Sequence, residues 1–337
     1  MMGTGKIIIL AYPDTFVKMS SEWQCKVMPL LGLGTWKQIK AGHAAMILIE
    51  NKTGNACYYD FGRYVTPEGK GRVRSAETDH ELILPIKAKL IGNGPLENLN
   101  DFLLWLDANP LKTHGEGRLI ASVCEEINFK EAQNYVLTLQ NRGSIPYGAF
   151  VKNGSNCARF VTETILASTK NKEIIKKLNH NKRFTPSAIG NVEKAASSNV
   201  FEVFNGEINN FSGSAFKENL TNYFHRQKDA FLYKQATSKL PKNAHILSGI
   251  GSSAWFTIEY LSDTENLYLI KRYSETHFVD YVGWFKTDDN FDVEKDYKFT
   301  YDSHCVFCHV IQNGNKIRFD KVKTCPEFSQ LQKAQSA

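Results

Sequence analysis

The sequence has no stretch that approaches 18 consecutive apolar residues, the length that a membrane-spanning helix needs. Its start, MMGTGKIIILAYPDTFV, has a short apolar run and no small-residue cleavage site, which is not typical of a secretory signal peptide. We therefore expect no membrane span and a cytoplasmic location.

A strong charge bias and internal repeats are also missing. Lys and Arg number 41 and Asp and Glu 35, and this small excess is spread along the chain, so charge does not predict a nucleic-acid partner. With 42% hydrophobic and 23% charged residues, the composition is typical of a folded protein. A length of 337 residues exceeds one ordinary core and predicts two domains.

The seven cysteines form no disulfide pattern, because their number is odd and their spacing irregular. They are Cys25, Cys57, Cys124, Cys157, Cys305, Cys308 and Cys325. We expect reduced thiols, which leaves a thiolate available as a nucleophile.

Hydrophobic periodicity predicts alternating strands and helices in the first half. Strands are expected at 6–12, 44–50, 56–65, 81–91 and 117–127, and helices at 96–108, 129–142 and from Cys157 onward. A glycine-rich polar loop, 67–71, separates the third and fourth of these strands. The fold class is therefore α+β, with an antiparallel sheet and helices.

The composition changes near residue 170 and again near 236. Residues 171–184 read as a basic helix with a narrow apolar edge, and 186–235 as a polar connecting segment between a domain at 1–185 and a domain at 236–330. The last of these contains β-type runs separated by polar turns. We expect it to be an antiparallel sandwich or barrel.

Cys157 follows the polar tripeptide Gly154-Ser155-Asn156 and begins an apolar helical pattern. An Asn or Ser cap would place the sulfur in the first helical turn, where unpaired amides and the helix dipole favour a thiolate. The same amides could receive an oxyanion. The alternative is a buried packing cysteine.

His43 is the candidate general base. It follows Gly42 at the start of a predicted strand, from which an imidazole can point along the sheet edge toward a docked helix. A structural histidine is the alternative for this residue.

The segment IPYGAFVKNGSNCARFV resembles the nucleophile segment of NlpC-type cell-wall endopeptidases. GHAAMILI, which carries the His, precedes the Cys, and this order is similar to the circularly permuted branch of the papain-like superfamily, which includes lecithin retinol acyltransferase-like proteins. The resemblance spans residues 43 to about 170. It implies a permuted papain-like domain with His43 and Cys157 as its catalytic pair.

Two further residues complete the candidate site. On the strand CYYDFGRY, Tyr58, Asp60 and Gly62 share one face, and Asp60 is the candidate for orienting the imidazole. The alternative is an exposed strand acid or a turn-facing salt-bridge partner. The resemblance assigns to Tyr147 a hydroxyl that faces the oxyanion, whereas a packing role beneath the loop is the alternative.

These residues favour a cysteine amidase or peptidase that cleaves an amide, peptide or isopeptide bond through an acyl-enzyme, with acyl transfer and thioester cleavage as close relatives. The substrate is a peptide, amide or acyl compound, and we expect no cofactor. The alternative is a non-catalytic binding protein whose β domain presents Trp255, Phe256, Trp284 and Phe285 to a ligand. The oligomeric state stays open.

The segment CVFCH, residues 305–309, spells a haem-attachment sequence. It lies inside a predicted strand, which would point neighbouring side chains to opposite faces. A zinc site from Cys305, Cys308, His304 and His309 would need a second ligand pair with matching spacing, and the sequence offers none. We set both readings aside.

Overall fold

The computed structural model describes residues 3–19, 22–92, 94–183, 185–225, 239–262 and 266–325. The chain divides into two compact units. The first comprises residues 1–62, 71–75 and 82–228, and the second comprises 63–70, 76–81 and 229–337. The second unit therefore takes two short segments from the N-terminal half of the sequence.

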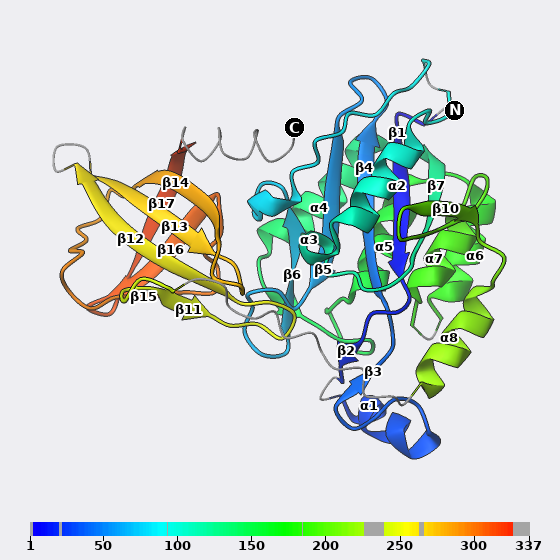
Figure 1. The fold of residues 1–337 in the computed structure, drawn as a ribbon, viewed down its shortest axis with the longest axis horizontal. Coiled ribbons are helices and arrows are strands. Elements are labelled where there is room, and N and C mark those ends of the chain that lie inside the picture. Colours follow the sequence, from blue (N-terminus) through cyan, green and yellow to red (C-terminus); the bar gives the residue numbers. More distant parts are fainter. Residues whose placement is uncertain are drawn as a thin grey trace. The chain divides into compact units, whose positions relative to one another are not determined.

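An eight-stranded sheet forms the centre of the first unit (Figure 1). The order is β10 (Glu207–Asn210), β9 (Phe201–Phe204), β7 (Leu119–Ile127), β1 (Gly5–Tyr12), β4 (His43–Glu50), β5 (Ala56–Gly62), β6 (Lys70–Ser75) and β8 (Ile145–Pro146). The pairs from β10 to β6 are antiparallel. The predicted α+β class is confirmed.

Apolar cores cover both faces of this sheet, which explains the continuous apolar run of β1. The face with Ile7 and Ile9 packs on helices, and the face with Ile8 and Leu10 packs on α2 and on the chain that precedes it (Figure 1). From α2 onward, the helices of the first unit are α2 (Leu99–Ala108), α3 (Pro110–Thr113), α4 (Phe129–Asn141), α5 (Cys157–Ser168), α6 (Lys172–Asn181), α7 (Ala188–Ala195) and α8 (Ala215–Phe224).

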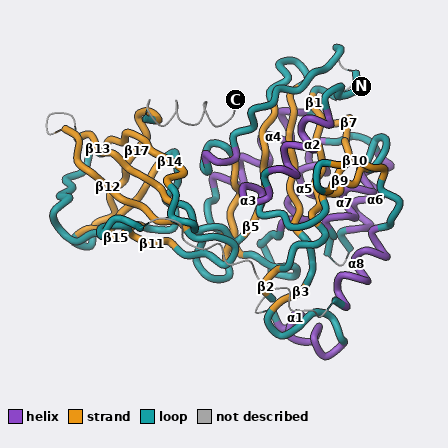
Figure 2. Tube along the Cα trace, in the orientation of Figure 1, coloured by secondary structure: helices purple, strands orange, loops and turns teal. Residues whose placement is uncertain are grey.

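The second unit is built, within its described residues, from strands and loops (Figure 2). Its antiparallel sheet runs in the order β11 (His245–Leu247), β12 (Ala254–Ser262), β13 (Leu267–Tyr273), β14 (Val279–Lys286), β17 (Asn315–Thr324), β16 (Phe307–Gln312) and β15 (Lys298–Phe299). The end strands meet, with the His245 and Phe299 rings 5.7 Å apart. Of the two predicted forms, the near-closed barrel is the one observed.

Aromatic side chains fill this barrel. Phe256 and Phe285 are 2% and 0% exposed and belong to the core, together with Phe319. The suggestion that Phe256 and Phe285 line a ligand surface is therefore wrong, because strand alternation points both inward. Trp255 and Trp284 are half-buried.

One predicted strand is wrong. Residues 81–91 contain a short 3-10 helix, η2 (His80–Leu82), and then extended chain without a ladder, while β6 occupies Lys70–Ser75, which overlaps the predicted loop. The alternation that suggested a strand is real, since Leu82, Ala88 and Leu90 all pack on the core. Packing of alternate side chains does not require a hydrogen-bonded partner strand.

The segment 186–235 differs from the expected polar connection. Its described residues contain α7, β9, β10 and α8, all within the first unit. Residues 226–235 lie outside the described residues. The sequence signal was weak because β9 and β10 are four-residue strands with many polar side chains.

No described helix of the chain is long and apolar enough to cross a bilayer.

Candidate active site

Cys157 is the first residue of α5, and Asn156 caps the helix. The Asn156 side-chain oxygen accepts a hydrogen bond from the Arg159 amide at 2.8 Å. Such a cap fixes the first turn, whose remaining N–H groups favour an anion. Cys157 keeps 9% of its surface exposed. Its sulfur therefore lies at the positive end of a helix, in a largely buried residue.

The loop before Cys157 is held by short backbone hydrogen bonds. The Ser155 amide donates to the Pro146 carbonyl at 3.0 Å, and the Gly148 amide donates to the Ser155 carbonyl at 3.0 Å. Gly154 is required here, since an added Cβ would lie 2.5 Å from the Pro146 oxygen. This arrangement brings Tyr147, whose ring stacks on Phe61 with centroids 5.7 Å apart, to the sulfur of Cys157.

His43 begins β4 at the end of the sheet where α5 starts. It is the cross-strand partner of Tyr12, and the two rings stack with centroids 6.2 Å apart. Gly42 before it has φ of 75°, a conformation that other residues rarely adopt. The imidazole is 6% exposed and is hydrogen-bonded to Cys157.

Asp60 lies on β5 on the other side of the imidazole. Its Oδ2 atom is 3.5 Å from His43 Nε2, and its surface is fully buried. Asp60 pairs directly with Ala45, so it shares a face with His43 two residues earlier on β4. The Tyr58 hydroxyl donates to the same carboxylate oxygen at 3.1 Å. Because Asp60 contacts Nε2, the Nδ1 atom remains to exchange a proton with the sulfur.

Arg74 on β6 is the principal site residue that sequence reasoning missed. It is the cross-strand partner of Asp60 and binds the carboxylate through two nitrogens. Nε donates to Oδ1 at 3.0 Å, and Nη2 donates to Oδ2 at 2.5 Å. Its side chain is 1% exposed. Opposite charges across a ladder are a usable sequence signal, but only when the strand itself is predicted.

These contacts shift the pKa values of the three groups in a consistent way. Burial alone would lower the pKa of His43, but hydrogen bonds with Asp60 and Cys157 raise it to about 9. Burial opposes ionisation of the Cys157 thiol, yet the hydrogen bond and charge of His43 lower its pKa, with help from the Ala44 amide and the Tyr147 hydroxyl. The geometry therefore favours a thiolate–imidazolium pair.

Asp60 stays ionised beside this pair. Burial would raise the pKa of its carboxyl, but the Arg74 guanidinium and the His43 imidazole hold it well below the ordinary value. A buried carboxylate of this kind fixes the orientation of an imidazole and stabilises its charged form.

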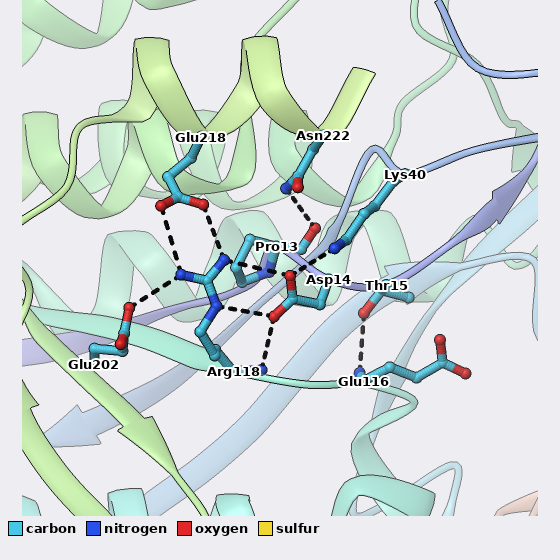
Figure 3. A network of polar contacts seen from close by, with 9 residues as sticks. All are labelled: Pro13, Asp14, Thr15, Lys40, Glu116, Arg118, Glu202, Glu218 and Asn222. Atoms are coloured by element: carbon cyan, nitrogen blue, oxygen red, sulfur yellow. Dashed lines mark hydrogen bonds and ion pairs between the residues drawn. The ribbon is translucent and has the colours of Figure 1, made fainter. Parts of the chain in front are cut away.

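A polar network supports the end of β1 that carries Tyr12 (Figure 3). Arg118, just before β7, binds Asp14 through Nε and Oδ2 at 3.0 Å, and Lys40 binds Asp14 at 2.8 Å. The other Arg118 nitrogens lie 3.2 Å from Glu202 on β9 and 2.9 Å from Glu218 on α8. The network therefore fastens α8 beside the strand that supports His43.

α8 also contributes a second missed residue, Tyr223. The Asn222 side chain donates to the Pro13 carbonyl at 2.9 Å, which locks the end of the helix to β1 (Figure 3). Burial and the charge of Cys157 raise the pKa of Tyr223. The charge of Cys157 therefore reaches Tyr223, although its helix falls in the segment expected to be a connection.

The structure therefore brings Cys157, His43, Asp60 and Tyr147 together from two strands, a loop and a helix. It adds Arg74 and Tyr223 to them. No group of three or more His, Cys, Asp or Glu side chains in the described part of the chain is arranged to hold a metal ion.

Cys305 and Cys308 lie in the second unit as buried thiols. Burial raises the pKa of Cys305 to about 12. The predicted continuous strand through CVFCH is wrong, because β16 begins only at Phe307 and a turn precedes it.

Comparison with known proteins assigns both parts of the chain. Residues 7–174 match the family described as Type VI secretion system effector TseH-like, and residues 244–322 match the DUF6695 C-terminal domain. The first match covers just under half of the chain, and it makes this part of the chain similar to TseH-like effectors.

A crystal structure of the Type VI secretion system effector TseH is similar over 61% of this chain and 97% of its own, with 19% identity and a TM-score of 0.40. None of the curated proteins matches the chain.

The expected cytoplasmic location is wrong. The matched family consists of effectors of a secretion system, and such proteins leave the cell that makes them.

Proposed function

We propose that the first unit is a cysteine hydrolase that cleaves an amide, peptide or isopeptide bond through an acyl-enzyme. The single observation that carries the proposal is the contact of His43 with both Cys157 and Asp60, with the sulfur at a capped helix start. This is the combination of nucleophile, base and orienting group that covalent acyl transfer needs.

In the first step, His43 holds the proton of the Cys157 thiol, and the thiolate attacks the substrate carbonyl carbon. A C–S bond forms, and the carbonyl π electrons move onto oxygen. The Tyr147 hydroxyl and the amides at the start of α5 stabilise this oxyanion. Tyr147 already contacts the sulfur, so its hydroxyl is close to the place where the oxygen develops.

In the second step, the oxyanion collapses and the C–N bond breaks. His43 gives its proton to the leaving amine, and Asp60 keeps the ring in position. Water, deprotonated by His43, then attacks the thioester, and the carboxylic acid and the Cys157 thiol are released. An alcohol or amine in place of water would give acyl transfer instead.

The non-catalytic alternative has less support. It relied on aromatic side chains of the β domain, and Phe256 and Phe285 are buried in the barrel core. A protein that had lost catalysis would also have no need for a buried carboxylate aimed at the imidazole.

The proposal predicts that the protein hydrolyses some members of a panel of amide, isopeptide, ester and thioester substrates. Mass spectrometry of the products measures this hydrolysis. Turnover should rise with pH as Cys157 ionises and fall as pH passes about 9, where His43 loses the proton that the leaving amine requires. If no substrate in the panel is cleaved and Cys157 carries no acyl adduct, the binding alternative replaces the hydrolase.

A further inference from the structure

Large apolar side chains are exposed on the segment that contains α1 (Trp23–Val27) and η1 (Met28–Leu31). Within 14 residues, Trp23 is 70% exposed, Val27 39%, Leu30 71%, Leu31 66% and Trp36 66%. We call these five residues the apolar face. Single exposed apolar residues are ordinary, but a concentration of this kind marks an interaction surface.

Four of these residues lie on two short helices that follow one another, α1 and the 3-10 helix η1, and Trp36 comes after them. The start of the segment is held against the rest of the first unit. Glu22 accepts hydrogen bonds from the Ala149 amide at 3.0 Å and the Phe150 amide at 2.9 Å, and Cys25 is 7% exposed.

The charged residues of the segment that carries the apolar face are lysines, apart from Glu22 at its start. Lys26 and Lys37 are exposed, and no ion pair is formed by either within the described residues. Glu22 is the sole acidic residue between Asp14 and Glu50 in the sequence, and its carboxylate is engaged by the two loop amides. The surface therefore presents apolar side chains flanked by unpaired positive charges.

We propose that the apolar face docks the protein on an anionic lipid bilayer. Exposed Trp and Leu side chains on a short segment, with lysines beside them in the sequence, are suited to the boundary between headgroups and acyl chains. The lysines favour an anionic bilayer over a second copy of the chain, because a second copy would bring the same positive charges together. This inference goes beyond the proposed hydrolysis and does not depend on it.

Docking would also place the candidate active site near the membrane surface. Glu22 joins the segment to the loop at 149–150, which leads from Tyr147 to Cys157. A second anchor joins the Gly34 amide to the Tyr223 carbonyl at 2.6 Å. A lipid surface that held the apolar face would therefore keep this end of the first unit, with its thiol, close to the membrane.

The test is flotation of the full chain with vesicles of phosphatidylcholine alone or with phosphatidylglycerol. The parent should bind the anionic vesicles and show a blue-shifted tryptophan emission. The triple variant Leu30→Ser, Leu31→Ser, Trp36→Ser should lose about tenfold or more in partition coefficient. The variant Lys26→Glu, Lys37→Glu should lose about thirtyfold or more, since each lysine near an anionic surface contributes about 1 kcal/mol.

Matched variants exist in the same unit. Ile91→Ser with Leu111→Ser removes apolar side chains that are 74% and 65% exposed, and Lys172→Glu with Lys176→Glu reverses two exposed charges on α6. Both should bind vesicles like the parent. Equal loss in these controls, or no binding of the parent to anionic vesicles, overturns the proposal. Sedimentation as a dimer that the triple variant dissociates would assign the face to a second copy instead.

Discussion

Replacement of Cys157 by Ala abolishes turnover, with an expected loss of about 10⁴-fold or more, because no other group in the site can form the acyl-enzyme. The fold should persist, since the substitution removes one sulfur atom at a helix start. The measurement is the initial rate on the best substrate of the panel, together with urea unfolding of both proteins.

Cys124→Ala is the matched control. Cys124 is buried in the same unit, and burial raises the pKa of its thiol to about 12, which makes it unreactive. This variant should keep the parental rate and lose a little stability. A Cys157→Ala protein with a tenth or more of the parental rate would rule out covalent catalysis by this residue.

Arg74→Met destabilises the first unit by about 3–5 kcal/mol, because it leaves the buried Asp60 carboxylate without its bidentate partner. The double variant Asp60→Asn, Arg74→Met removes both charges and should recover most of this loss. Its turnover should nevertheless be about 10³–10⁴-fold lower than that of the parent, since the imidazole has lost the group that orients it. Urea unfolding and initial rates together measure the two effects.

The stability difference depends on pH in a defined direction. The folded-state pKa of Asp60 lies below its unfolded value, so the stabilisation is present at neutral pH and is lost as pH falls below about 4. Lys6→Met is the control, since Lys6 is a buried cation 3.5 Å from Glu125 in the same sheet. It should cost stability and leave turnover unchanged. Recovery of turnover in the double variant would show that Asp60 does not orient His43.

Local sequence signals were sufficient for the elements that carry the catalytic pair. The continuous apolar runs of β1 and β4 predicted strands, and the cap before Cys157 predicted the start of α5. The order of His43 and Cys157 in the sequence suggested that the two residues form a candidate catalytic pair. This suggestion came from a family resemblance and not from periodicity. The placement of their side chains beside one another could not be derived from either residue alone.

The residues that were missed lie on elements whose sequence is polar. β6 reads KGRVRS, and its buried arginines look like the solvent-facing residues of a loop. Arg74 can be buried because Asp60 lies opposite it on the neighbouring strand. This pairing of β5 with β6 cannot be read from the sequence of either segment. Tyr223 was missed for a similar reason, since the polar network of Asp14 and Arg118, and not an apolar face, fastens α8.

The rate of Cys157 alkylation by iodoacetamide across pH tests the central claim most directly. Cys57, which is exposed, serves as the reference within the same protein, and peptide mass spectrometry separates the two rates. Cys157 should react with an apparent pKa clearly below the ordinary value of about 8.5, and His43→Ala should raise that pKa. A Cys157 profile that coincides with that of Cys57, or one that His43→Ala leaves unchanged, would contradict the thiolate–imidazolium pair.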